Sequence, residues 1–273
     1  MRPYVWYSKA TCVTGKRIKD ELGIEGGRFV PTPSHNPIIC YGARANKVTM
    51  NKYPYLKDKT YLNSIYKIEK NINKHNALIK MRDNNVSIPP MYNWDEFNEL
   101  MFKMGGLNPL PVIARKSMHH GGSGLKIVDR EFINVNGLLH SRDILKYYSY
   151  FLELINAERE YRVHVFQNQV IRITRKYLKE GLQEEELSKI QRVVKSHDNG
   201  WVHSLRDIEK VPETVKEEAL KAVKALDYDF GGVDILYKDG KSYVLEVNSG
   251  CGLDNGSLDT YKKYLQKWLE QVE

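Results

Sequence analysis

The stretch that decides the fold of this chain is Asp229-Phe-Gly-Gly-Val-Asp234-Ile-Leu-Tyr-Lys-Asp-Gly-Lys-Ser-Tyr-Val-Leu-Glu246-Val-Asn248. Its two apolar runs, 231–237 and 242–248, flank an Asp-Gly pair and therefore predict a β-hairpin. Side chains alternate along a strand, so Glu246 and Asn248 point to one face. Carboxylate and amide oxygens side by side are the ligands that Mg²⁺ prefers. The second strand therefore predicts a metal site near its end.

Asp234 on the first strand has to reach the same face. A two-residue Asp239-Gly240 turn would place it opposite Leu245, whose side chain points to the other face. A three-residue turn over 238–240 would place it opposite Val244 and restore the shared face. We therefore expect the longer turn, with Asp234 completing a metal triad. The alternative, a solvent-facing polar edge, is disfavoured because exposed strands rarely place Asn beside Glu.

Length and composition exclude several protein classes. The 273 residues, 41% hydrophobic and 28% charged, can bury a large core, which argues against a disordered or fibrous chain. Cys12, Cys40 and Cys251 are widely spaced and odd in number, so they predict neither disulfides nor a metal knuckle. No apolar run approaches the ~18 residues of a membrane span, and the first residues lack a signal-peptide core. We expect a cytoplasmic protein with no membrane partner.

The charge is basic. Lys and Arg number 42 against 34 Asp and Glu, which gives a net charge of +8. This balance favours an anionic partner, whether a nucleotide, an acidic peptide or nucleic acid. It does not choose among them, and a solvated basic surface explains it equally well.

The chain has no internal repeat, which favours one mixed α/β body. A leading α/β unit over 1–60 is predicted, with strands at 4–7 and 37–42, a helix at 15–22 and a polar linker at 47–60. The remaining predicted elements are helices at 73–84, up to 152, at 212–226 and from 258, strands at 111–115 and 125–128, and a hairpin over 160–166 and 170–176.

A glycine-rich segment, His119-His120-Gly121-Gly122-Ser123-Gly124, separates the strands at 111–115 and 125–128. Main-chain N–H groups without side chains around them can close over phosphates, and Arg115 and Lys116 precede the segment. It matches neither a Walker nor a Rossmann pattern, and a simple hairpin turn explains it as well. The adjacent histidines point apart, which disfavours a metal pair.

The order of these motifs resembles the ATP-grasp superfamily over about residues 60–273. Within it, the chain is similar to carboxylate–amine ligases such as the ribosomal-protein glutamate ligases and D-alanine–D-alanine ligase. The resemblance implies an α/β fold in which two lobes, 61–152 and 153–273, clasp ATP behind the leading unit. It also implies ATP and Mg²⁺, or Mn²⁺, as cofactors.

The resemblance assigns roles only to positions that match the family pattern. The metal ligands are Asp234, Glu246 and Asn248, at intervals of 12 and 2 residues. The nucleotide-binding residues are Lys74, Arg115, Lys116, the lid Gly121, Gly122, Ser123 and Gly124, the adenine hinge Glu153, Leu154 and Ile155, and Glu160 at the ribose. The catalytic residues are Arg175, which steadies an acyl phosphate, and Asn248. Ser249, Gly250, Cys251 and Gly252 depart from the family, which commonly has Pro-Gly there. We expect this segment to border the substrate because it follows Asn248 and its two glycines leave main-chain N–H groups free to meet a carboxylate.

The implied reaction joins a carboxylate to an amine. ATP phosphorylates the carboxylate, and an amine then attacks the acyl phosphate to form an amide or peptide bond and release phosphate. The expected partners are a small molecule or peptide that carries the carboxylate, and an amine acceptor; a second carboxylate on one substrate is also expected. Two alternatives stay open: a kinase of the same fold, and a non-catalytic scaffold that binds nucleic acid or peptide. The complete triad disfavours the scaffold.

Overall fold

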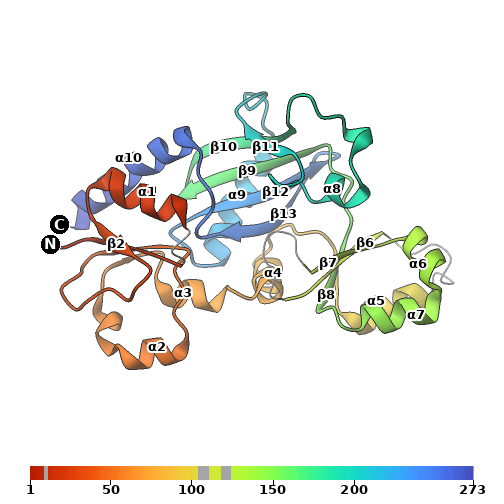
Figure 1. The fold of residues 1–273 in the computed structure, drawn as a ribbon, viewed down its shortest axis with the longest axis horizontal. Helices are drawn as coiled ribbons and strands as arrows, with labels where there is room; N and C mark the ends of the chain where they lie inside the picture. The colour runs from red at the N-terminus through yellow and green to blue at the C-terminus, as the bar shows by residue number, and fades with distance from the viewer. Residues whose placement is uncertain (9–11, 104–110, 118–123, 273) are drawn as a thin grey trace.

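The computed structural model describes residues 1–8, 12–103, 111–117 and 124–272. Three sheets follow one another along the long axis of the molecule, with the five-stranded sheet between two four-stranded ones (Figure 1). Within these residues, no helix is long and apolar enough to cross a membrane.

The leading sheet is parallel, in the order β2-β1-β3-β4. Its strands are β1 (Tyr4–Tyr7), β2 (Glu25–Gly27), β3 (Ile38–Tyr41) and β4 (Tyr61–Leu62). Helix α1 (Val13–Leu22) ends at Gly23, whose φ of 64° suits a residue without a Cβ.

The predicted linker over 47–60 is wrong. The segment folds into α2 (Lys47–Lys52) and a 3₁₀ helix (Pro54–Asp58). Leu56 is fully buried in the core next to the leading sheet, with Tyr53 and Tyr55 packed against the same cluster. A few apolar residues are enough to hold a polar segment against the core. The stabilisation depends on the apolar area that is buried and not on the average composition of the segment.

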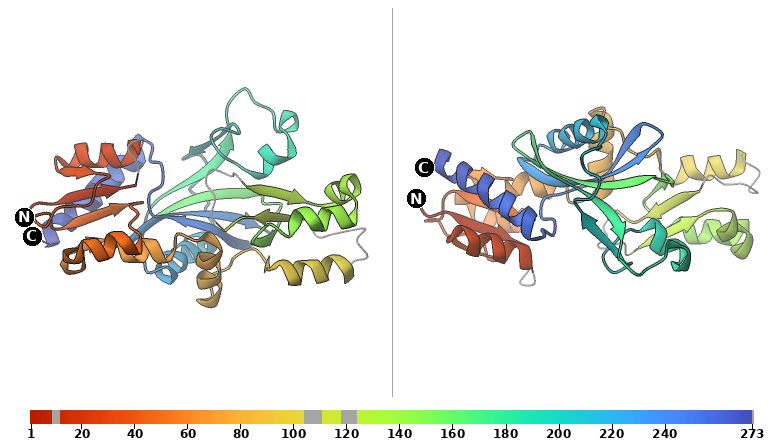
Figure 2. Two further views of the ribbon diagram at one scale, coloured as in Figure 1. Left: turned by 60° about the horizontal axis from the view of Figure 1, so that its bottom comes forward. Right: turned by 90° about the horizontal axis from the view of Figure 1, so that it is seen from above.

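The leading unit also needs the end of the chain. Helix α10 (Asn255–Val272) lies at the same end of the molecule as the N-terminal segment (Figure 2). Its Tyr261 and Leu265 share a buried cluster with Val5 and Ile39 of the leading sheet. We therefore place the boundary of the leading unit after β4 and include α10 in it.

The middle sheet has the order β11-β10-β9-β12-β13, with every neighbouring pair antiparallel. Its strands are β9 (Arg159–Phe166), β10 (Gln169–Leu178), β11 (Trp201–Ser204), β12 (Phe230–Lys238) and β13 (Lys241–Asn248). Helix α9 (Glu213–Ala225) buries Val215, Ala219 and Ala222 against it. A 3₁₀ turn (Glu184–Glu186) and α8 (Lys189–Val193) lie between β10 and β11.

The third sheet has the order β5-β8-β6-β7. Its strands are β5 (Met91–Tyr92), β6 (Val112–Arg115), β7 (Leu125–Val128) and β8 (Tyr150–Glu153). Helices α5 (Trp94–Lys103), α6 (Arg130–Asn136) and α7 (Leu138–Leu145) accompany it. Helix α3 (Ile65–Lys70) instead buries Ile65 and Ile68 in the core beside the leading sheet, and α4 (Lys74–Asp83) contacts α9 and β13. The predicted helix up to 152 therefore stops at Leu145, and the apolar run that follows it pairs as β8.

Candidate active site

The acidic hairpin closes with a two-residue turn, so the predicted three-residue turn is wrong. Lys238 pairs with Lys241, and the turn consists of Asp239 and Gly240. Both residues have positive φ, 47° and 77°. This is the backbone that Asp-Gly favours in tight hairpins, because it matches the twist of the flanking strands.

A β-bulge, and not the turn, brings the two carboxylates together. Ile235 pairs with Val244, whereas the next pair along the hairpin is Asp234 with Glu246. Leu245 is therefore the extra residue on β13, and everything beyond it changes face. The predicted shared face exists, but for a different reason.

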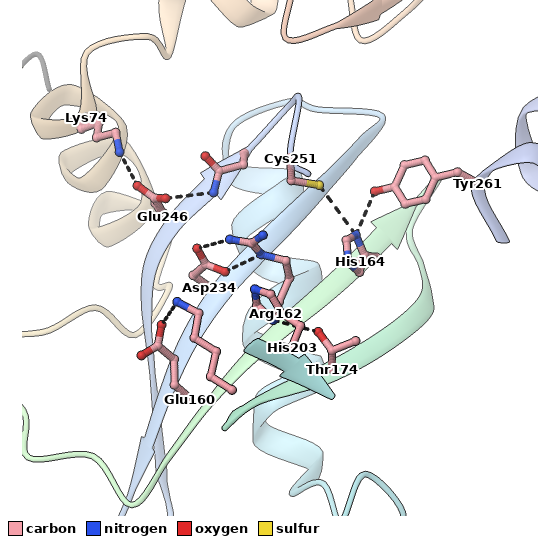
Figure 3. A network of polar contacts seen from close by, with 12 residues as sticks. Lys74, Glu160, Arg162, His164, Thr174, His203, Asp234, Glu246, Cys251 and Tyr261 are labelled. Carbon is pink, nitrogen blue, oxygen red and sulfur yellow. Dashed lines mark hydrogen bonds and ion pairs between the residues drawn. The ribbon is translucent and has the colours of Figure 1, made fainter. Parts of the chain in front are cut away.

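Each carboxylate of the predicted triad is held by a cation (Figure 3). Arg162 donates two hydrogen bonds to Asp234, of 2.8 and 2.9 Å. Lys74 pairs with Glu246, whose other oxygen accepts a 2.9 Å hydrogen bond from Asn248 Nδ2. These contacts link α4, β9, β12 and β13 into one polar network.

The electrostatics keep both acids ionised. Burial alone would raise the pKa of Asp234, but the charge and hydrogen bonds of Arg162 hold it well below its ordinary value. Burial likewise opposes ionisation of Glu246, and Lys74 outweighs it, so this pKa is also lowered. Two ionised carboxylates on paired positions, with an amide beside them, fit a hard divalent cation. In this structure, Lys74 and Arg162 balance the negative charge of the two acids.

A cavity of about 1040 Å³ contains this network and extends well beyond it. That volume is at the upper end of small-molecule sites, enough for more than one ligand. Among the residues that line it are Arg17, Lys74, Arg115, Glu153, Leu154, Ile155, Glu160, Arg162, Lys176, Asp234, Glu246 and Gly252.

The predicted hinge connects the third sheet to the middle sheet, between β8 and β9. Glu153, Leu154 and Ile155 all line the cavity there. The amide of Glu153 already donates to Pro90 O (2.9 Å), and that of Leu154 to Pro111 O (2.8 Å). The fold therefore uses two of the three predicted amides, and the adenine role of this segment stays a prediction.

The structure separates the two candidate basic residues at the end of β6. Arg115 lines the cavity, whereas Lys116 is exposed and packs beside Gly124. Lys74 is the first residue of α4, which Asn73 caps. Arg115 and Lys74 thus reach the cavity from two different elements. The predicted lid residues Gly121, Gly122 and Ser123 lie outside the described residues.

Glu160 lies on the cavity face of β9 but is already paired. It is buried, and its Oε1 lies 2.5 Å from Lys176 Nζ on β10. Burial raises the pKa of Glu160, although Lys176 opposes the shift. Its assignment to a ribose stays a prediction.

Arg175 does not reach the cavity, which corrects its predicted role at an acyl phosphate. Its guanidinium stacks over the Tyr177 ring, 4.7 Å from the centroid, and faces Asp207 at 3.4 Å. Its neighbours Thr174 and Lys176 line the cavity instead, because alternate side chains of a strand point to opposite faces.

Arg162 is the residue that sequence reasoning missed. It stands two positions after Glu160 in the same strand, so the period of two already placed both on one face. What the sequence did not reveal is that β9 lies between β10 and β12, directly beside Asp234.

The predicted substrate loop is only partly open to the cavity. Gly252 lines it, and a Cβ there would meet nothing within 4 Å. Gly250 packs on Gly42, where a Cβ would come within 2.7 Å of the Gly42 Cα, so this glycine serves close approach and not ligand binding. Ser249 is buried, and its carbonyl accepts a hydrogen bond from the Gly42 amide (3.0 Å).

Cys251 is buried among polar groups. Its Sγ lies 3.8 Å from His164 Nδ1, and its carbonyl accepts a hydrogen bond from the Tyr41 hydroxyl. Burial raises the pKa of the Cys251 thiol, so it remains protonated and inert as a nucleophile. Cys251 therefore anchors the loop.

The far end of the cavity is formed by the leading unit. Val13, Thr14 and Arg17 of α1 line it together with Leu253 and Asp254. Arg17 Nη1 donates to Leu253 O at 3.3 Å, and Thr14 Oγ1 accepts from Leu253 N at 3.4 Å. No sequence pattern marked these residues, since they lie about 240 positions from the loop they contact.

Two histidines on the cavity face are neutral. Burial and the charge of Arg162 lower the pKa of His164 to about 3 and that of His203 to about 4. His164 Nδ1 lies 3.2 Å from the Tyr261 hydroxyl, and His203 Nδ1 lies 3.2 Å from Thr174 Oγ1. Within the described residues, no three His, Cys, Asp or Glu side chains gather as a metal site of their own.

Comparison with known proteins gives one family and one fold. The RimK-like ATP-grasp domain model matches residues 111–269. The ATP-grasp ligase PsnB with its minimal precursor superposes with a TM-score of 0.69 at 15% identity, over 98% of this chain and 99% of that one. D-alanine–D-alanine ligase from Bacillus anthracis gives 0.64 at 17% identity, over 98% and 92%. The macrocyclase MdnC of Microcystis aeruginosa MRC, bound with precursor peptide MdnA, gives 0.64 at 11%, over 97% and 99%. No curated protein matches the sequence.

Proposed function

The chain belongs to the RimK-like ATP-grasp family, and on that premise we propose that its cavity joins a peptide carboxylate to an amine through an acyl phosphate. The family confirms the ATP-grasp fold that the sequence predicted. A carbon–nitrogen ligase that uses ATP with Mg²⁺ is supported by the neighbours, which include D-alanine–D-alanine ligase complexed with ATP and PsnB complexed with Mg and ADP. The residue roles and the substrate given below are our proposal.

The nucleotide occupies the part of the cavity between the third and middle sheets. Lys74 and Arg115 bind its phosphates, because they reach the cavity from separate elements and can hold two sides of a phosphate chain. Leu154 and Ile155 border the base. When bound, Mg²⁺ supplies charge neutralisation to the phosphates, and Asp234, Glu246 and Asn248 are the residues that would hold it.

Arg162 is proposed as the residue that steadies the acyl phosphate. It lies beside Asp234 and is largely buried, with a side chain 16% exposed. A guanidinium offers a planar fork that matches phosphate oxygens, and the surrounding protein excludes water that would weaken the contact. Its cation balances negative charge as the phosphoryl group moves to the carboxylate.

The substrate is proposed to enter at the end of the cavity formed by α1. Arg17 and Gly252 line this end. Arg17 supplies a cation, and Gly252 leaves the main chain uncovered because it has no side chain. A peptide with an acidic side chain fits this end, since Arg17 would pair with one carboxylate while another is activated. Three structural neighbours were solved with peptides: PsnB with its precursor, a Chryseobacterium gregarium ligase with leader and core peptide, and MdnC with MdnA.

One observation carries the proposal: two ionised carboxylates converge on paired strands within a cavity that also contains Lys74, Arg115 and Arg162. The test is ADP release with a panel of acids and acidic peptides, with hydroxylamine as the acceptor. A trapped hydroxamate identifies the activated carboxylate. ADP release that needs no amine and leaves a phosphorylated product would instead identify a kinase.

The control for this experiment is Glu246→Gln, which keeps the shape of the side chain and removes its charge. Hydroxamate formation should disappear in this variant. Equal hydroxamate yield in the variant and the unmodified chain would contradict the proposed site.

A further inference from the structure

Tyr150 touches both elements that carry the proposed phosphate-binding cations. It is the first residue of β8 and pairs directly with Arg115 of β6, so the two side chains share a face of the third sheet. Its ring stacks on His75 with centroids 4.8 Å apart and planes within 2°. His75 follows Lys74 at the start of α4.

The hydroxyl of Tyr150 is buried with no hydrogen-bond partner in the part of the chain that the structure describes, and the residue is 0% exposed. Among the same residues, Nε of Arg115 is also buried without a partner. Buried polar groups in folded proteins are almost always paired, because an unpaired one costs free energy. Two such groups at directly opposed strand positions beside a ligand cavity therefore point to a partner that arrives with the ligand.

The two groups define what that partner is. Burial raises the pKa of Tyr150, with Arg115 opposing and Glu246 adding to the shift, so the phenol stays protonated and can donate. Arg115 Nε–H is a donor only. Two adjacent donors select a ligand that only accepts, and a phosphate oxygen is such a group.

We propose that Tyr150 is a phosphate-binding residue of the nucleotide site, its O–H and the Nε–H of Arg115 donating to a phosphate of ATP. The inference rests on the proposed nucleotide-binding role of this end of the cavity. Tyr150 is 0% exposed in this structure, so the contact requires the groups that cover its hydroxyl to move when the ligand binds.

Tyr150→Phe tests this by removing only the hydroxyl. Without ligand, the melting temperature of the variant should equal or exceed that of the unmodified chain, because an unpaired buried group is lost. With Mg²⁺ and AMPPNP, the dissociation constant should rise about tenfold, the scale of one hydrogen bond to a charged group. The response to adenosine, which has no phosphate, should be unchanged.

Tyr66→Phe is the matched control. The Tyr66 hydroxyl is also buried and has no hydrogen-bond partner among the described residues, but it lies on α3 with its ring against Tyr61, whereas Tyr150 lies opposite the cavity residue Arg115. Its loss should leave the AMPPNP dissociation constant within about twofold, since it contacts no part of the proposed site.

Failure of the Tyr150 role and failure of the proposed function give different results. A Tyr150→Phe chain that melts lower but binds AMPPNP normally would show a structural role alone. If the unmodified chain itself does not bind Mg²⁺ and AMPPNP, the proposed function fails first and the inference fails with it. Normal AMPPNP binding by the unmodified chain, with no loss in the variant, overturns only the role of Tyr150.

Discussion

The two ends of the cavity are built in different ways. At the end where we propose the metal site, Asp234 and Glu246 lie on one hairpin and form ion pairs with Arg162 and Lys74. At the substrate end, Arg17 of α1 meets the loop at Leu253, more than 200 residues further along the chain. A metal site needs fixed geometry, which a hairpin provides locally. Recognition of one particular substrate needs a surface, which only distant segments can form together.

The largest effect is expected at the metal end. Glu246→Gln should lower ATP turnover by ~10³-fold or more, because it removes a charged oxygen ligand from Mg²⁺. Asp234→Asn and Asn248→Ala should have effects of similar size. ADP release at saturating ATP measures this, with circular dichroism as the check on folding. Near-normal turnover in two of the three variants would contradict the triad.

The next effect separates two arginines of the middle sheet. Arg162→Lys should lower turnover by ~10²-fold, because lysine keeps the charge but loses the two-point contact. Arg175→Lys is the matched control and should stay within about twofold, since Arg175 lies on the other face of β10. The ratio of kcat values for the two variants is the measurement. A reversed ratio would restore the role that the sequence assigned to Arg175.

A smaller effect should distinguish the substrate end from the nucleotide end. Arg17→Gln should raise KM for an acidic peptide ~10-fold, the scale of one charge-assisted hydrogen bond, and leave KM for ATP unchanged. Steady-state kinetics with each substrate varied in turn gives both constants. Equal changes in both would mean that α1 supports the whole cavity and does not select the substrate.

The smallest effect concerns pH. His203 has a folded pKa of about 4, below the ordinary 6.5, so the unfolded chain binds more protons between these values. Its contribution to stability is therefore complete above pH 6.5 and is lost as pH falls toward 4. Melting temperatures from pH 7 to 4.5 should fall less steeply in His203→Gln than in the unmodified chain. Parallel curves would show that His203 is not kept neutral by the fold.

The sequence was most informative where the candidate site residues lie only a few positions apart. Asp234, Glu246 and Asn248 were predicted from alternation along two strands, whereas Lys74 came from the resemblance to the ATP-grasp pattern. Even there, the turn was wrong and the bulge at Leu245 went unseen. A bulge depends on how two strands pair, and the same residues satisfy either arrangement.

The sequence was least informative where contacts join distant segments. The segment 47–60 looked like a linker, because its average polarity hides the buried Leu56. Arg175 was predicted as a site residue. The sequence alone does not show which face of its strand meets the cavity, because the neighbouring strands decide this. Tyr150 fell within a stretch predicted as helix up to 152, and its buried hydroxyl, without a partner among the described residues, became visible only with its neighbours in place.

The sequence by itself predicted the family, the hairpin and the acids Asp234 and Glu246 that we propose as metal ligands, because these depend on residues a few positions apart. The tertiary structure alone decided that Arg162 and not Arg175 faces Asp234, that α1 lines one end of the cavity, and that α10 shares a buried cluster with the leading sheet. The physical reason is one of range. Strand alternation and turn geometry act over a few residues, whereas burial and ion pairing act between any groups that the folded chain brings into contact.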